Sequence, residues 1–366
     1  GAAVAAPTPA FLILMTGRFG RRDILRGAAA LCGAGLAASP RQAFAQHGRA
    51  AAPAIARLEV NARPIRSFDP RDASHLRYGA LQFRSGLVLT SPFRAFGGLS
   101  ALRLDDKGER FIACSDRANW FAGRLVYDGK ALSGMADVTS APMQGPDGQA
   151  ITARGWFDTE SLALDGSIAY VGLERVNKIL RFDLAEGDLL ARGQIVSAPA
   201  HVAKLPFNRG LESLVFVSRA RSGAGQALAG TLIAMSERAL DGEGRIRAFL
   251  IGGAMPGEFS IRRRDDFDIS DATLLPSGSL LLLERKFSLL SGLGIRIRRI
   301  PIAQVRPGAS VDGDVIFDVD LGYEIDNMEG IDFHIADGDT VLTLISDDNF
   351  SMIQRTLLLQ FTLVDE

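Results

Sequence analysis

Acidic side chains return at regular spacing along this 366-residue chain, each just before an apolar stretch. The clearest copy of the pattern reads Asp326–Asn327–Met328–Glu329–Gly330–Ile331. Aligned on one position per copy, the repeats are 60, 52, 59 and 58 residues apart, at Ser100, Glu160, Glu212, Asp271 and Glu329. Carboxylates can bind a hard cation such as Ca²⁺ through oxygen, or can act as general bases.

A second pattern follows each copy and pairs an acid with an arginine. It is an apolar run that ends in an acid, and in four copies an arginine comes next. The acids are Asp116, Glu174, Glu237, Glu284 and Asp347, and the arginines are Arg117, Arg175, Arg238 and Arg285. Guanidinium groups suit the phosphate or carboxylate group of a substrate, so these four arginines are candidate substrate-binding residues.

The elements that must position these side chains read as β-strands. The apolar runs are short, are separated by turn residues, and lack the i, i+3, i+4 spacing of a helix. A repeat of this length predicts an all-β fold, a β-propeller of five or six blades. The last repeat, from Glu329, is one strand short, so we expect an N-terminal strand to complete the C-terminal blade and close the ring. A sixth blade would need residues 78–90 to form a hairpin around Ser85–Gly86.

In a propeller, equivalent acids of successive blades form a ring around the central channel. One interpretation is a site at the channel mouth, where carboxylates hold one or more cations and metal-bound water attacks a phosphoryl or acyl centre. Glu160, Glu212 and Glu329 are then the catalytic candidates. The other interpretation is that the acids cap turns and tie blades together through ion pairs. The candidate metal ligands are Asp116, Glu160, Glu174, Glu212, Glu237, Asp271, Glu284, Glu329 and Asp347.

Residues 1–45 read as an export signal. Arg21–Arg22 lies in a basic segment, a short apolar segment runs from Gly27 to Ala38, and Ala43–Phe44–Ala45 fits a cleavage site. The arginine pair resembles a twin-arginine signal, and Met15 is a candidate for the true start. We therefore expect residues 46–57 to be a flexible lead-in and residues 58–366 to form a single propeller domain. The protein would be periplasmic or secreted.

Composition narrows the classes of partner. With residues 1–45 removed, 36 basic and 41 acidic side chains remain, so nucleic acid is not expected to bind. No run reaches the ~20 apolar residues of a spanning helix. Cys114 is then the single cysteine and is expected in the core. Signatures of zinc hydrolases, α/β-hydrolases, P-loops, dinucleotide folds and haem attachment are absent from the sequence.

Over residues 90–363 the chain resembles the bacterial phytase-like family, described as having esterase-like activity of phytase. The resemblance rests on Gly97–Gly98–Leu99–Ser100, Ser115–Asp116–Arg117, Asp158–Thr159–Glu160–Ser161–Leu162, Asn208–Arg209–Gly210–Leu211–Glu212, Asn327–Met328–Glu329–Gly330–Ile331 and Ser346–Asp347–Asp348–Asn349. It implies an exported β-propeller and a calcium-dependent phosphoesterase, with the acids and asparagines of these motifs as metal or substrate contacts. Ser100 and Asp271 replace the glutamate of the motif, so the ring is not fully symmetric.

Three hypotheses of function remain open. The first is a calcium-dependent hydrolase of phosphate esters or other small esters, acting on a small anionic or ester substrate. The second is a non-catalytic propeller that binds a ligand or partner protein. The third is a lactone or sugar-acid hydrolase. All three would use the same acids, so the sequence does not decide whether the protein is an enzyme.

Overall fold

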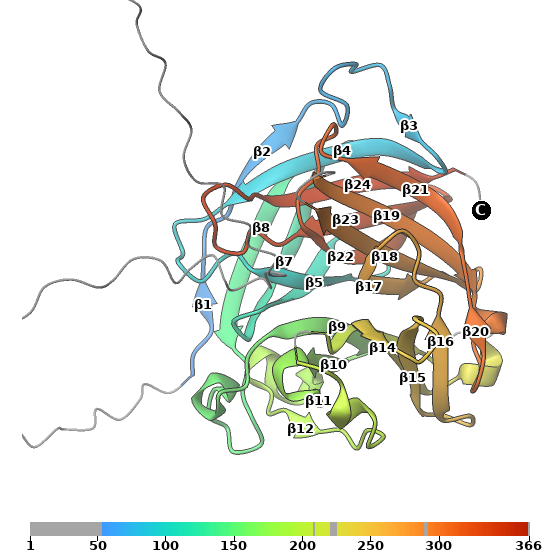
Figure 1. Ribbon diagram of the computed structural model, residues 1–366. Coiled ribbons are helices and arrows are strands. Elements are labelled where there is room, and N and C mark those ends of the chain that lie inside the picture. The colour runs from blue at the N-terminus through green and yellow to red at the C-terminus, as the bar shows by residue number, and fades with distance from the viewer. Residues whose placement is uncertain (1–52, 208, 220–224, 289–291, 365–366) are drawn as a thin grey trace, which may run out of the picture. The chain divides into compact units, whose positions relative to one another are not determined.

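The computed structural model describes residues 53–207, 209–219, 225–288 and 292–364. The predicted export signal and most of the predicted lead-in lie outside these residues. The chain from Ala51 to Glu366 forms one compact unit. Within it, strands make five separate sheets, which are the five blades of a β-propeller (Figure 1).

The first two blades follow the repeat directly. Blade 1 carries β1 on its outer edge and runs inward through β8, β7 and β6 to β5. Blade 2 has the order β12-β11-β10-β9. The strands of these blades are β1 (Ala56–Arg57), β5 (Leu99–Leu104), β6 (Arg110–Ser115), β7 (Asn119–Asp128), β8 (Ala131–Pro142), β9 (Thr159–Asp165), β10 (Ile168–Leu173), β11 (Lys178–Asp183) and β12 (Gln194–Ile195).

Blades 3 and 4 follow the same plan. Blade 3 has the order β13-β14-β15-β16-β20, and blade 4 has the order β17-β18-β19-β21. Their strands are β13 (Leu211–Val217), β14 (Thr231–Leu240), β15 (Ile246–Gly252), β16 (Gly257–Ile261), β17 (Asp268–Leu274), β18 (Ser279–Ser288), β19 (Gly292–Pro301), β20 (Ser310–Val311) and β21 (Asp314–Asp320). Helical turns occur only in connections; the one α-helical turn that the structure describes is α1 (Leu184–Gly187).

The fifth blade joins the two ends of the propeller. Its order is β2-β4-β24-β23-β22, with β3 paired to β4. The predicted closure is confirmed, because the N-terminal strand β4 lies antiparallel to the C-terminal strand β24 (Figure 1, cyan beside red). The strands are β2 (Asn61–Ile65), β3 (Arg77–Tyr78), β4 (Leu81–Thr90), β22 (Met328–Ala336), β23 (Asp339–Ser346) and β24 (Thr356–Leu363).

The hairpin predicted around Ser85–Gly86 is wrong, and with it the sixth blade. β4 is one continuous strand through both residues. Gly86 lies between Leu359 and Ile65, and a Cβ atom there would come within 2.8 Å of the Leu359 side chain. A glycine inside a strand often marks such a close approach.

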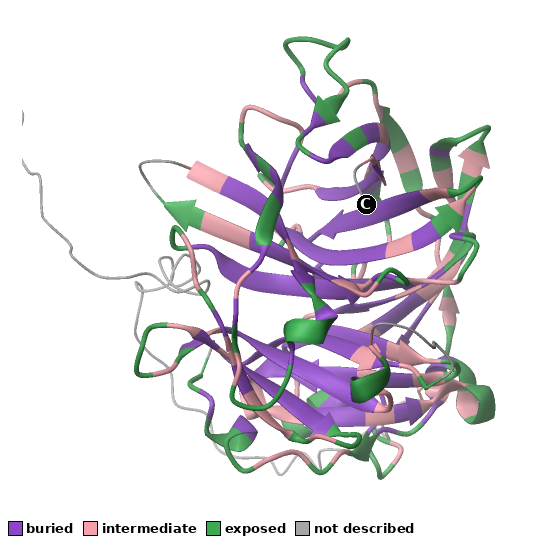
Figure 2. Ribbon diagram, turned by 90° about the vertical axis from the view of Figure 1, so that its right-hand side faces the viewer, coloured by how far each residue is buried: buried purple, intermediate pink, exposed green. Residues whose placement is uncertain are grey.

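The hydrophobic core is divided among the five seams between blades. The inner strands contact one another in a closed cycle, β5–β9–β13–β17–β22–β5. Five apolar clusters follow the same cycle, and each draws its buried residues mainly from two neighbouring blades. Strands buried on both faces read as near-continuous apolar runs, which is how the repeats appear in the sequence. Figure 2 shows these strands largely buried and the exposed stretches mostly in the connections.

Candidate active site

Every inner strand begins with a β-bulge at the same end of the propeller, here called the mouth. In each case the strand pairing skips one residue, which leaves its side chain outside the regular ladder. Bulges re-aim a side chain and are frequent beside active sites. The skipped residues are Ser100, Glu160, Glu212, Ser270 and Glu329.

The second strand of each blade also ends at the mouth. A backbone hydrogen bond at the start of the inner strand shows which residue at this end occupies the same position in each blade. In four blades an acid donates its N–H across 2.9 Å to the carbonyl two residues before the bulge. These acids are Asp116, Glu174, Glu237 and Asp347. In blade 4 the matching position pairs Asp268 with Arg285, which is a cation and not an acid.

The sequence alignment of blade 4 was therefore one residue out of register. It placed Asp271 and Glu284 in the two rings of acids, where the structure places Ser270 and Arg285. A shift of one residue turns a strand side chain to the other face of its sheet. Asp271 and Glu284 consequently serve other partners.

Those partners are buried arginines. Asp271 is fully buried and receives two hydrogen bonds from Arg103, at 2.8 and 2.9 Å, and one from the Ile331 N–H at 2.9 Å. Glu284 is also fully buried and is bonded by both Nε and Nη2 of Arg298. The contacts of these two acids therefore match the second interpretation, in which acids tie blades together through ion pairs.

At the mouth, the structure brings three of the predicted acids around one arginine. Arg285 Nη2 lies 3.2 Å from Glu237 Oε1 and 3.6 Å from Glu212 Oε1, and its Nε lies 3.5 Å from Glu329 Oε1. All four side chains are at most 13% exposed. The side-chain amide of Asn327 donates to the same Glu329 oxygen at 2.8 Å. Carboxylates from two inner strands and one second strand thus meet at one guanidinium.

The remaining predicted acids lie around the mouth in blades 1, 2 and 5. Glu174 accepts a hydrogen bond from the Gly210 N–H of blade 3 at 3.1 Å, which ties two blades together. Asp347 accepts from Asn349 N–H within its own turn. A Cβ atom at Gly98 would come 2.3 Å from Asp116, so this glycine leaves room for the carboxylate. Glu160 is buried at its bulge.

Two contacts at the mouth could not be read from the sequence. Asp348, an acid of the Ser346–Asn349 motif, accepts a hydrogen bond from the Gly98 N–H at 3.0 Å, so it links blade 5 to blade 1. Phe350 has a φ of 50°, which is unusual for a bulky residue, and its ring lies under Arg117. The Asp347–Asp348 pair was visible as a departure from the acid-arginine pattern, but the contacts across the seam were not.

The four predicted arginines divide into two pairs. Arg285 and Arg238 are engaged by acids, since Arg238 lies 3.4 Å from Asp268 and 3.7 Å from Glu237. Arg117 and Arg175 stack on aromatic rings instead, with guanidinium carbons 3.3 Å from the ring centre of Phe350 and 4.1 Å from that of Phe157.

The stacked pair is the better candidate for binding an anion. Neither Arg117 nor Arg175 has an ion-pair partner among the residues that the structure describes. Stacking occupies a face of the guanidinium and leaves the N–H edge for a phosphate or carboxylate.

The acids that the structure describes at the mouth do not form a site for the calcium ion that the resemblance implies. In the described part of the chain, no three acidic, histidine or cysteine side chains are arranged as ligands of one metal ion. Where Glu212, Glu237 and Glu329 come closest together, Arg285 already lies within 3.6 Å of each. At ~4 Å and an effective dielectric of ~20, a guanidinium and a divalent ion would repel by about 8 kcal/mol. The residues at Arg285 do not fit a metal, and calcium stays a prediction from the sequence.

Two further observations bear on other candidate sites. Cys114 is fully buried, and burial raises the pKa of its thiol, so it is an unreactive core residue.

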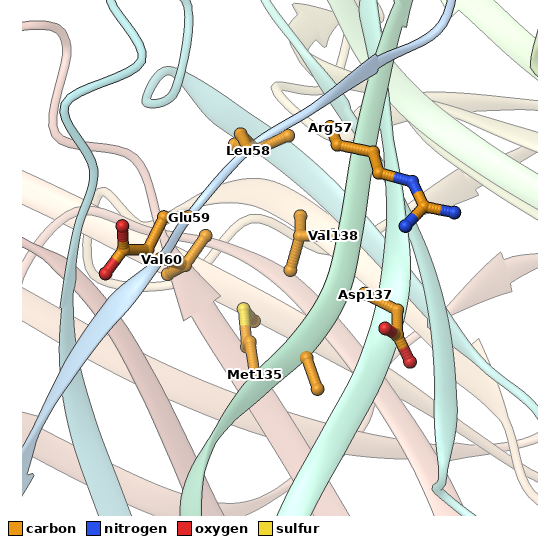
Figure 3. A pocket seen from close by; sticks show the side chains of 8 residues that line it. Arg57, Leu58, Glu59, Val60, Met135, Asp137 and Val138 are labelled. Carbon is orange, nitrogen blue, oxygen red and sulfur yellow. The ribbon is translucent and has the colours of Figure 1, made fainter.

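A cavity of about 440 Å³ lies between the segment at residues 57–60 and β8 (Figure 3). Its lining includes Leu58, Val60, Met135 and Val138 but no residue of the mouth, so it does not belong to the acid cluster.

None of the helices that the structure describes is both long enough and apolar enough to cross a membrane.

Comparison with known proteins identifies the family and little else. No curated protein matches the sequence. One solved structure with a similar fold is the major Malassezia sympodialis allergen Mala s 1, at 12% identity and a TM-score of 0.41 over 82% of this chain and 95% of the allergen. A second is the β-propeller domain of Myceliophteria thermophila Cps50 (Swd1), at 10% identity and a TM-score of 0.32 over 70% of this chain and 67% of that chain. A third is Myxococcus xanthus glutaminyl cyclase, at 11% identity and a TM-score of 0.36 over 74% of this chain and 92% of that chain. Similarity this distant says nothing about function.

The family model described as phytase-like, with esterase-like activity of phytase, matches residues 94–350. This range includes all ten mouth positions, which are the five bulge residues and the five residues at the ends of the second strands. The chain therefore belongs to the phytase-like family of β-propellers.

Proposed function

We propose that this protein hydrolyses phosphate esters or other small esters at the mouth of the propeller. Membership of the phytase-like family supports a hydrolase-like role for the propeller. The observation that carries the proposal is the convergence of Glu212, Glu237 and Glu329 on Arg285. Buried carboxylates beside a fixed cation, at the same mouth as two arginines stacked on aromatic rings, combine a base with groups that bind anions.

In this proposal the arginines and one glutamate of the mouth have different roles in the reaction. Arg117 and Arg175 bind the anionic part of the substrate through their N–H edges. Glu329 is held by Asn327 and acts as the general base that takes a proton from the attacking water. Arg285 stabilises the negative charge that develops on the substrate oxygen. None of these steps uses a metal ion, although the sequence also predicts a calcium-dependent reaction.

Glu329→Gln should reduce kcat on the best ester by roughly 10²–10⁴-fold, the usual contribution of a general base. The assay would compare a phosphate monoester, inositol hexakisphosphate, a short carboxylic ester and a lactone. The matched control is Asp337→Asn in the turn between β22 and β23 of the same blade, where the Asp337 side chain is 69% exposed and pairs with Lys130. Activity of Glu329→Gln equal to that of the control would reject Glu329 as the base.

The assay also separates the alternatives. Hydrolysis of the lactone alone would favour the lactone or sugar-acid hydrolase. No turnover of any ester by the wild-type protein would favour a propeller that binds a ligand or partner without catalysis.

We also propose that the protein is exported to the periplasm or beyond by a twin-arginine signal, on the pattern of residues 1–45. Replacing both Arg21 and Arg22 with lysine should leave most of the protein in the cytoplasm. Fractionation of bacterial cells measures this. Unchanged export of the double variant would argue against the twin-arginine route.

A further inference from the structure

Blade 4 is the one blade that carries no acid at either ring of the mouth. At the bulge, blades 2, 3 and 5 carry a glutamate, whereas blades 1 and 4 carry Ser100 and Ser270. At the end of the second strand the other four blades carry an acid, whereas blade 4 carries Arg285. Compared with blades 2, 3 and 5, blade 4 therefore lacks two negative charges and has one positive charge more.

The positive charge reaches acids on both sides of its own blade. Arg285 contacts Glu212 and Glu237 of blade 3 and Glu329 of blade 5. Glu212 and Glu329 side chains are 1% and 2% exposed, so water contributes little to screening them. Three buried carboxylates that all lie within 3.6 Å of one side chain need a cation among them.

Glu237, one of the three glutamates at Arg285, also contacts a second arginine. Arg238 lies within 3.7 Å of Glu237 and 3.4 Å of Asp268, and Arg263 donates to Asp268 at 2.8 Å. Charges of opposite sign therefore alternate along the mouth of blades 3 and 4. This arrangement keeps the acids facing Arg285 at a defined distance.

We propose that Arg285 is a built-in cation that takes the place of a divalent metal ion at the mouth of this propeller. Three glutamates from two other blades converge on it at ion-pair distances of 3.2–3.6 Å. A guanidinium stays charged at any physiological pH and is not lost to chelators. The inference concerns charge at the mouth, so it holds whether or not the site turns over an ester.

The first test is on the wild-type protein and needs no variant. Its Tm should be the same, within a degree, in EDTA and in 1 mM CaCl₂, MgCl₂ or MnCl₂. Titration calorimetry with CaCl₂ should give no stoichiometric binding. A Tm that falls in EDTA and returns with one of these metals would overturn the proposal.

The second test removes the charge and keeps the volume. Arg285→Met should have a lower Tm in EDTA, because three buried carboxylates lose their cation. Added CaCl₂ should then raise the Tm by roughly 3–5 °C at 100-fold excess over the Kd. Arg285→Lys keeps a positive charge and should show no such rise.

Arg238→Met is the matched control, since Arg238 is a neighbouring arginine that approaches only Glu237 among the three glutamates. It should gain no response to calcium. A folded Arg285→Met that shows no metal-dependent rise, or an equal rise in Arg238→Met, would contradict the proposal. If Arg285→Met does not fold even with calcium, the wild-type melts and the lysine variant still decide it.

Discussion

Replacing Arg103 with methionine should lower the free energy of unfolding by about 3–5 kcal/mol, the usual cost of removing one partner of a buried ion pair. The Arg103 side chain is 8% exposed and its partner Asp271 is fully buried. Beyond the two bonds to Asp271, the guanidinium donates to the carbonyls of Ile331, Leu214 and Ala272 at 3.1–3.3 Å. One side chain of β5 thus binds to β13, β17 and β22.

The loss should grow as the pH rises. Burial raises the pKa of Asp271 even beside Arg103, and without the arginine this effect is unopposed. A carboxyl whose folded pKa lies above its unfolded value destabilises the fold as pH rises above the unfolded value of about 3.9. Urea unfolding of Arg103→Met and wild type at pH 5 and pH 8 should therefore differ more at pH 8.

The double variant Arg103→Met/Asp271→Asn controls for the buried charge. Because it removes the stranded carboxylate, it should recover part of the stability and lose the added pH dependence. A change below about 1 kcal/mol in Arg103→Met would mean that the pair contributes no more than an exposed salt bridge.

Most of the fold could be predicted from the repeat in the sequence. Strand starts spaced by 52 to 60 residues, four of them with a carboxylate, gave five countable blades, and the short final repeat required a strand from the other end. These features are local, so they can be read without coordinates. The apparent turn at Ser85–Gly86 was misread because a glycine that allows close packing looks the same as a glycine in a turn.

The site was less accessible to sequence reasoning. Blade 4 contains Ser270–Asp271 and Glu284–Arg285, so an alignment by residue type can choose either register. The strand pairing decides it, because the apolar face must point to the neighbouring blade. The pairing of Asp271 with Arg103, 168 residues earlier in the chain, depends on ring closure, and nothing in the local sequence indicates it.

Removing β4 should prevent the propeller from folding as a soluble monomer. Leu81, Phe83, Leu87 and Leu89 of this strand are at most 8% exposed. Burying such side chains contributes about 1.5–3 kcal/mol each, so the strand accounts for roughly 6–12 kcal/mol. A whole domain is stable by only about 5–15 kcal/mol.

Two truncations bracket the segment that holds β4. A chain starting at Arg66 loses β1 and β2 but keeps β3 and β4, and it should fold with a lower Tm. A chain starting at Pro92 also loses β3, β4 and the buried Phe68, and it should aggregate, because β24 becomes an exposed edge that pairs eight residues with β4 in the intact protein. Size-exclusion chromatography and thermal melts distinguish these states.

Adding β4 back as a separate peptide tests the physical reason. A peptide of residues 78–91 can supply both the ladder hydrogen bonds and the four apolar side chains, as in strand complementation. It should restore monomeric, folded protein to the shorter truncation, and a peptide of the same composition in scrambled order should not. A truncation at Pro92 that melts like the longer one would show that the seam between blades 5 and 1 holds without its strand. In that case, ring closure would depend on contacts such as Asp348 with Gly98 and Arg103 with Ile331.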